Sequence, residues 1–93
     1  MNSGTVVKKM QTLILSDGTE LTNSYAALTV DRLFLYIQNG MNLIQVFMLV
    51  SDPEKLDNII YASGDHQEVY GGFKTLEAIS LGVNGVVSVV LKR

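Results

Sequence analysis

One histidine is the residue best suited to acid–base or metal chemistry in this sequence. His66 lies between Asp65 and Glu68, so three potential metal ligands fall within four residues. A zinc site needs three or four converging ligands, and these three belong to a predicted turn without a second histidine. A serine or threonine nucleophile would also need His66 as its base, and no Gly-x-Ser-x-Gly motif is present. The pattern favours a solvated hairpin tip, and the chain is predicted not to be an enzyme.

Carboxylates gather just before this histidine. Asp52, Glu54 and Lys55 resemble the acid-acid-lysine cluster of metal-dependent nucleases in composition. In the nuclease pattern one residue separates the glutamate from the lysine, so both point the same way along a strand. Here the two are adjacent and would point to opposite faces. Ser51 and Glu54 instead fit a capping box, with Pro53 in a first helical turn.

The segment from residue 52 to residue 68 is the most acidic part of the chain, with five acids and a single base, Lys55. It is predicted to form a turn, a short strand and a hairpin tip, so that several carboxylates share one exposed edge. Such an edge would steer the protein towards a basic partner. Tyrosine is favoured at interfaces, so the predicted partner-binding residues are Asp52, Glu54, Asp57, Asp65, Glu68 and Tyr70.

Composition predicts one packed domain spanning residues 1–93, with residues 1–4 as a loose end. The chain is 47% hydrophobic and 17% charged, carries a net charge of −2 and has no cysteine. No cysteine means no disulfide and no thiolate chemistry. No secretory signal and no span of roughly 20 apolar residues is present, which predicts a cytoplasmic protein. No glycine-rich cofactor motif occurs, so no cofactor is expected, and the scattered basic residues argue against direct nucleic-acid binding.

Turn signals and hydrophobic patterns predict the elements that hold these residues. Strands are expected at 5–15, from residue 20, and at 33–37, with the first hairpin turn at Asp17-Gly18. Residues 41–50 are almost entirely apolar and predict a buried helix, although a strand is also possible there. One helical turn and a strand at 58–62 follow, although the spacing of Leu56, Ile59 and Ile60 also fits a helix, so residues 52–60 are open to either structure. The next strand begins at residue 67 and continues through a bulge at Gly71-Gly72 to residue 81, before an Asn84-Gly85 turn and a strand at 86–91.

The predicted fold is therefore α+β, in the order β-β-β-α-β-β-β, with one buried helix covering a curved antiparallel sheet or small barrel. The side chains expected to be buried are Leu33, Leu35, Ile44, Phe47, Ile79, Val87 and Val89. A domain of this size folds alone only marginally. We therefore expect a homodimer, formed through the C-terminal strand or an exposed tyrosine face.

Several segments resemble small accessory proteins of prophages and mobile elements of low-GC Gram-positive bacteria. These segments are residues 17–21, 33–37, 47–55, 70–73 and 85–89. The resemblance implies an accessory role and brings no catalytic residues with it. Small acidic phage proteins include inhibitors of host defence nucleases, the anti-CRISPR class. The chain resembles these inhibitors in general character and shares no sequence motif with them.

The sequence therefore favours a non-enzymatic protein-binding module of a phage or mobile element. In this interpretation its acidic edge docks on a basic, nucleic-acid-binding host protein such as a defence nuclease. The alternative is a structural or assembly component of a phage particle that acts as an oligomer. A small enzyme or metal-binding protein that uses His66 is the third hypothesis.

Overall fold

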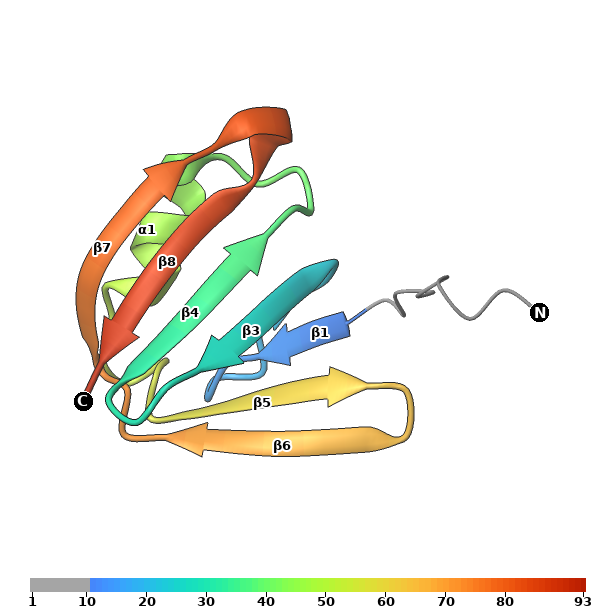
Figure 1. Cartoon of the computed structure of the whole chain (residues 1–93), viewed down its shortest axis with the longest axis vertical. Helices are drawn as coiled ribbons and strands as arrows, with labels where there is room; N and C mark the ends of the chain where they lie inside the picture. Colours follow the sequence, from blue (N-terminus) through green and yellow to red (C-terminus); the bar gives the residue numbers. More distant parts are fainter. Residues whose placement is uncertain (1–10) are drawn as a thin grey trace.

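The computed structural model describes residues 11–93 of the 93-residue chain. Eight strands and one α-helix form two antiparallel sheets with the helix packed on one of them (Figure 1). The elements are β1 (Gln11–Ile14), β2 (Glu20–Leu21), β3 (Ser24–Leu28), β4 (Arg32–Ile37), α1 (Leu43–Val50), β5 (Asn58–Ser63), β6 (His66–Gly71), β7 (Thr75–Leu81), a 3-10 turn η1 (Val83–Gly85) and β8 (Val87–Lys92).

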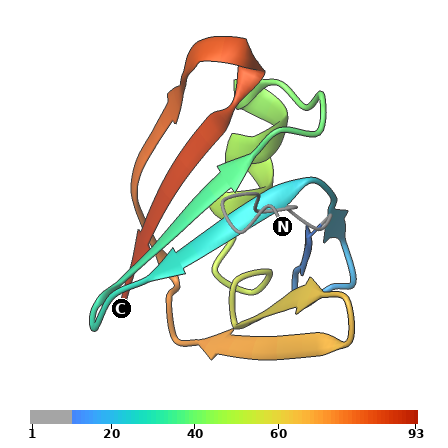
Figure 2. The same ribbon diagram turned by 45° about the vertical axis from the view of Figure 1, so that its right-hand side comes forward.

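Each sheet contains four strands. Sheet A has the order β2-β1-β5-β6, and sheet B has the order β3-β4-β8-β7. Helix α1 lies against β7 and β8, on the face of sheet B that is turned away from the viewer in Figure 1. A view rotated by 45° shows the β5–β6 hairpin crossing below sheet B (Figure 2). The predicted α+β class with one helix is confirmed, whereas the two open sheets are not a closed barrel.

Alternation along the strands of sheet B builds much of the core. Leu33, Leu35 and Ile37 of β4 are buried, and β4 pairs with β8 so that Leu91, Val89 and Val87 lie directly opposite them. Successive side chains of a strand point to opposite faces, so this inner face meets the helix and sheet A. The predicted burial of Leu33, Leu35, Val87 and Val89 is confirmed, and Ile79 is partly buried.

Helix α1 is buried along one stripe rather than all round, so the predicted burial of Ile44 and Phe47 is wrong. Val46 and Val50 are fully buried, while Ile44 and Phe47 are 70% and 47% exposed. Residues three and four apart share a helix face, so the stripe through Val46 and Val50 fixes which side faces the core. Met48 lies with Ile44 and Phe47 on the opposite side and is 67% exposed.

The two polar residues near the helix start, Asn42 and Gln45, cap the helix and do not identify its solvent-exposed face. Asn42 Oδ1 accepts the backbone N–H of Gln45 at 2.8 Å, and Gln45 Oε1 accepts that of Asn42 at 2.9 Å. This reciprocal capping box satisfies amides that have no partner within the helix. Asn42 and Gln45 therefore serve the helix N-terminus and do not mark a single solvent face.

The order of elements along the chain also differs from the prediction, because four strands precede the helix and four follow it. Strand β3 was not predicted, and it pairs along its whole length with β4. The predicted continuous strand through Gly71-Gly72 is two strands, β6 and β7, which belong to different sheets. Gly72 has a φ of +87°, which lets the chain turn between the sheets. Of the predicted strand at 5–15, residues 5–10 and the loose end at 1–4 lie outside the described residues.

The hairpins predicted at Asp17-Gly18 and Asn84-Gly85 form as expected, with different turns. At the first, β1 and β2 are paired, and only Gly18 has a positive φ. At the second, Asn84 and Gly85 have φ values of 60° and 75°, and Val86 N–H donates to the Val83 carbonyl at 3.3 Å. Positive φ at both central residues defines a type I′ turn, which joins β7 to β8.

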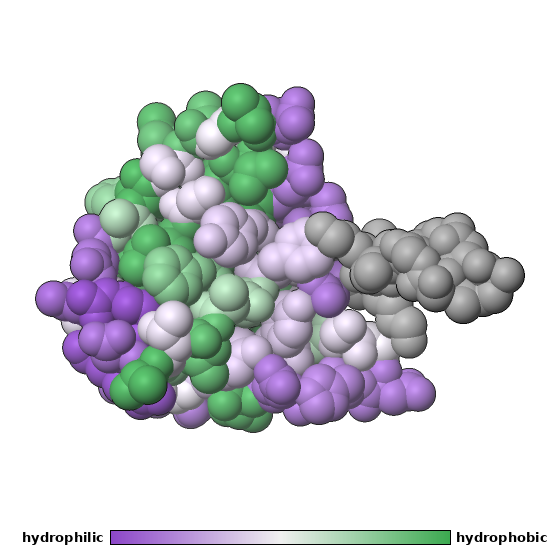
Figure 3. Space-filling model, in the orientation of Figure 1, coloured by the Kyte–Doolittle hydropathy of each residue, from purple (hydrophilic) through white to green (hydrophobic). Residues whose placement is uncertain are grey.

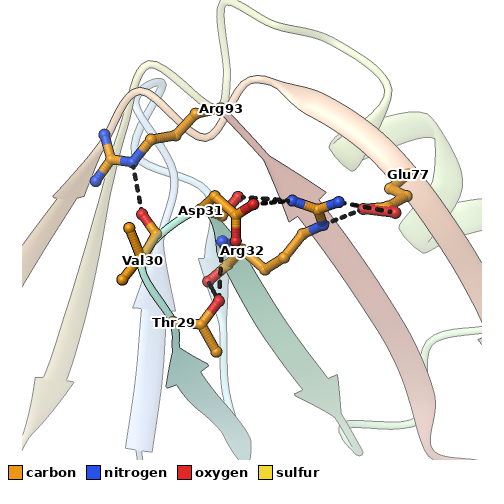
Figure 4. Close-up of polar contacts among 6 residues, drawn as sticks. All are labelled: Thr29, Val30, Asp31, Arg32, Glu77 and Arg93. Atoms are coloured by element: carbon orange, nitrogen blue, oxygen red, sulfur yellow. Dashed lines mark hydrogen bonds and ion pairs between the residues drawn. The ribbon is translucent and has the colours of Figure 1, made fainter.

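A group of polar contacts fixes the other end of sheet B (Figure 4). Arg32 forms ion pairs with Asp31, at 2.7 Å, and with Glu77 of β7. Arg93 Nε donates to the Val30 carbonyl at 3.3 Å, which ties the end of the chain to the β3–β4 turn. The charged groups of sheet B are thus concentrated at this end. Strand β8 lies between β4 and β7, so it has no free edge for the dimer predicted through the C-terminal strand.

Candidate protein-binding surface

Strand β6 presents three of the polar residues singled out in the sequence on one face. His66, Glu68 and Tyr70 are two residues apart, and alternate residues of a strand point the same way. His66 Nε2 lies 3.0 Å from Glu68 Oε2, and the Tyr70 hydroxyl donates to Glu68 Oε1 at 2.5 Å. These contacts with His66 and Tyr70 hold the pKa of the Glu68 carboxyl below its usual range. The carboxylate joins an exposed imidazole to a buried phenol.

Tyr70 is the anchor of this group. Its side chain is only 9% exposed, and its ring stacks on Tyr61 of β5 with centroids 6.1 Å apart. Burial, followed by the hydrogen bond to Glu68, raises the pKa of Tyr70 above the ordinary value of 10.0. Burial likewise raises the pKa of Tyr61. Tyr70 was predicted as a contact residue, and the structure makes it chiefly a core residue with a bonded hydroxyl.

The raised pKa values give a test in alkaline solution. The fold favours the neutral phenol of Tyr70, so this contribution to stability is present below pH 10.0 and is lost as the pH rises through the raised value. A titration followed by tyrosinate absorbance should show a late component, and the unfolding temperature should fall over the same interval. Tyr70→Phe should remove one late tyrosine, and Tyr36→Phe should leave both Tyr61 and Tyr70 titrating late. A late component that survives Tyr70→Phe unchanged would refute the assignment.

The acids before β5 lie in a turn rather than in a capped helix. Asp52 Oδ1 accepts the Glu54 N–H at 3.0 Å, and the Lys55 N–H donates to the Asp52 carbonyl at 3.1 Å. Ser51 ends α1, donating its N–H to the Phe47 carbonyl at 3.0 Å. The predicted capping box of Ser51 with Glu54 is therefore wrong. Asp52 directs the turn because its side chain bonds the backbone two residues ahead.

Two lysines pair with part of this acidic turn. Lys55 Nζ lies 3.4 Å from Asp52 Oδ2 and 3.7 Å from Asp17 Oδ2, and Lys74 Nζ lies 2.7 Å from Asp57 Oδ1. Exposed pairs of this kind contribute little to stability, and all three carboxylates keep substantial solvent exposure. Glu54 and Asp57 line an open depression of about 250 Å³ together with Pro53 and Lys74.

The predicted acidic residues are spread along the β5–β6 hairpin. Asp52, Glu54 and Asp57 precede β5, and Asp65 lies in the turn at the opposite end of the strand. A six-residue strand is roughly 20 Å long, so these two groups are well separated. Glu68 lies between them on β6. Five carboxylates against Lys55, Lys74 and Arg93 leave this side of the molecule negative, and Figure 3 shows hydrophilic residues at the hairpin tip.

Strand β6 is the outermost strand of sheet A, and no described residue pairs with its outer edge (Figure 1). The two-residue turn Gly64-Asp65 makes Ser63 and His66 a hydrogen-bonded pair. Bonded and non-bonded positions alternate along an antiparallel pair. The backbone groups of Gln67 and Val69 therefore point to the open side.

The open edge ends at Gly71. Asn58, which lies opposite Gly71, bonds its N–H to Ser16 Oγ at 2.7 Å instead of to β6. The Gly71 carbonyl accepts a hydrogen bond from Arg93 Nη1 at 3.2 Å. An accessible row of backbone donors and acceptors thus runs from the hairpin tip to Arg93. Such a row is able to pair with another strand.

Among residues 11–93, no group of three or more histidine and acidic side chains is placed to bind a metal ion. The His66 imidazole is 68% exposed, and its hydrogen-bond partner in this part of the chain is Glu68. Asp65, the third predicted ligand, forms no hydrogen bond or ion pair with either side chain in the described structure. Within the same residues no helix is long and apolar enough to cross a membrane.

A second exposed surface was missed in the sequence. Ile44, Phe47 and Met48 of α1 are exposed, as are Leu81 at the end of β7 and Val83 in η1. The i, i+3, i+4 spacing shows that the three helix residues share one face, but not that this face is the exposed one. A helix without charged residues predicts burial on every side, and that prediction is wrong for α1.

No protein-family model, curated protein or solved structure matches this chain.

Proposed function

We propose that this chain is a non-enzymatic protein-binding module that adds an extended, basic segment of a partner protein to the open edge of β6. The observation that carries the proposal is the free edge of β6 with carboxylates at both ends and at its middle. In this proposal the partner is a basic nucleic-acid-binding protein of the host, and the chain acts as a phage or mobile-element inhibitor that occupies its basic segment.

Backbone pairing would supply the docking geometry. An edge strand binds an extended peptide through main-chain hydrogen bonds, and side chains on either side set the specificity. Strand β6 contains no proline or lysine, which are residues that commonly protect an edge from pairing. Val69 is 62% exposed, so the face of β6 opposite Glu68 also offers apolar contact.

Charge would select the sequence of the partner. Glu68 lies at the middle of β6, Asp65 at the hairpin tip, and Asp57 and Glu54 next to the start of β5. A lysine-rich strand lying along β6 would meet a carboxylate at each of these three places. Such complementarity speeds association and makes binding sensitive to salt.

The test uses a synthetic peptide of alternating lysine and valine as the probe. Its affinity should fall on the order of tenfold when Asp52, Glu54, Asp57 and Glu68 are changed to their amides, mainly through a slower association rate. Salt should weaken binding of the wild type more than binding of this variant. The matched control changes Asp17, Glu20, Asp31 and Glu77, which gives the same net charge but leaves the β6 side intact.

A backbone variant separates edge pairing from simple charge attraction. Val69→Pro removes an N–H that points to the open side, a position where an edge strand tolerates proline. This variant should stay folded and lose peptide binding while keeping every carboxylate. Equal binding by wild type, Val69→Pro and the amide variant would overturn the proposal.

The alternative function, an oligomeric component of a phage particle, is favoured by a different observation. The apolar outer face of α1 carries no charge and resembles an assembly surface more than a site for a basic segment. That function predicts oligomerisation with little dependence on salt, and it does not require the acids of the β5–β6 hairpin.

A further inference from the structure

The exposed side of α1 differs from an ordinary solvent-facing helix surface. Helix α1 contains no charged residue, and its outward residues Ile44, Phe47 and Met48 form one apolar stripe. A helix on the surface of a monomer normally presents polar side chains opposite its buried stripe. Here the buried stripe and the solvent-facing stripe are both apolar.

The stripe continues onto the β7–β8 hairpin. Leu81 lies on the same face of β7 as Ile79, the face against which α1 packs, and it is 58% exposed. Val83, in the following turn, is 83% exposed. Gln38 Nε2 donates to the Asn84 carbonyl at 3.2 Å, which holds the loop before α1 against this turn. Figure 2 shows the start of α1 beside the end of the hairpin, and Figure 3 shows hydrophobic residues at the end of that hairpin.

We infer that these residues form a two-fold interface with a second copy of this chain. The α1 surface is defined as Ile44, Phe47, Met48, Leu81 and Val83. The inference concerns sheet B and is independent of the binding proposed for β6 of sheet A.

The area of the α1 surface fits such a dimer. The exposed parts of its five side chains amount to roughly 600 Å², which is at the upper limit of the largest apolar patch on a typical monomer. Two copies facing each other would bury at most on the order of 1,200 Å² from these five residues. That is the lower end of the range for stable, specific interfaces.

The chemistry of the surface favours a second copy over other occupants. Its neighbours Asn42, Gln45 and Asn84 are neutral amides, so the α1 surface itself would not repel a second copy although the chain carries a net charge of −2. A charged partner would find no complementary group there. An anionic membrane would also be a poor match, because interfacial helices carry lysine or arginine on their polar face and α1 has neither.

The experiment measures molar mass by light scattering and sedimentation from about 1 to about 200 μM. Wild type should approach twice the monomer mass, and the midpoint should stay constant or move to lower concentration as salt rises. Met48→Glu should weaken the dimer at least tenfold because it buries an unpaired charge at the interface. Ile44→Asn, which adds no charge, should weaken it as well.

Val30→Glu is the matched control. Val30 is 91% exposed and lies in the β3–β4 turn, at the end of sheet B opposite the β7–β8 turn. This variant adds the same charge and should leave the dimer unchanged. A wild type that is monomeric at the highest concentration would overturn the inference, as would a dimer that tolerates both α1 variants. A monomer that instead binds vesicles of neutral and anionic phospholipid through Met48 would also overturn it and would assign the surface to a membrane.

Discussion

Replacing Phe73 with alanine is expected to lower the free energy of unfolding by about 3–5 kcal/mol. Phe73 is 1% exposed and lies where the chain passes from β6 in sheet A to β7 in sheet B. Its ring packs in the core that both sheets share, and the Arg93 guanidinium lies 4.2 Å from the ring centroid. Truncation therefore leaves a cavity and removes the stacking partner of a residue that ties the end of the chain to Gly71 and Val30.

Phe47→Ala makes the same chemical change on the surface of the molecule and serves as the control. Because Phe47 is 47% exposed, the monomer should lose about 1 kcal/mol or less. Chemical denaturation at a protein concentration low enough to keep the chain monomeric compares the two variants. Equal losses for Phe73→Ala and Phe47→Ala would contradict the assignment of the core.

Gly85→Val should destabilise the protein by about 1–3 kcal/mol through backbone strain alone. Gly85 has a φ of +75°, a conformation that β-branched residues resist strongly. Space is not the obstacle, because a Cβ at this position would meet no atom within 4 Å. The loss should therefore arise from the type I′ turn that sets the register of β7 against β8.

Gly82→Val is the matched control within the same connection. Gly82 has a φ of −96°, and a Cβ there would make an ordinary contact of 3.5 Å with the Val86 carbonyl. Its loss of stability should be clearly smaller. Thermal unfolding of both variants, with amide exchange in β7 and β8, measures the difference. A Gly85→Val protein as stable as Gly82→Val would show that the turn does not require a positive φ.

Local signals in the sequence were sufficient for the turns and for the inner face of sheet B. The pair Asn84-Gly85 predicted the β7–β8 turn, because few residue pairs adopt a positive φ at both central positions of a turn. The runs at 33–37 and 86–91 predicted strands since β-branched and aromatic residues fill them. In these segments, local preference and tertiary packing favour the same structure.

Other elements depended on contacts that no local pattern reveals. Strand β3 contains two alanines, which have low strand preference, and it forms because β4 offers it a partner. The break between β6 and β7 depends on the two sheets that the chain connects at Gly72. For α1, periodicity identified a helix but not its orientation, because both faces are apolar and only packing against β7 and β8 decides between them.

The candidate surfaces show the same division. The sequence alone showed that residues 52–68 are acidic and predicted that they form a turn, a short strand and a hairpin tip. The pairing of Asp57 with Lys74 and the position of β6 at a sheet edge depend on tertiary structure. Sequence alone therefore indicated which charges were present but not that an open backbone edge lies between them.

A nuclear magnetic resonance titration with the lysine–valine peptide follows binding at each backbone amide of β6. We expect the largest shift changes, and new protection from amide exchange, at Gln67 and Val69, whose backbone groups point to the open side of β6. The same peptide with glutamate in place of lysine should leave these amides unchanged. Changes confined to α1 or to sheet B, or equal responses to both peptides, would contradict the proposal that β6 and its flanking carboxylates bind a basic strand.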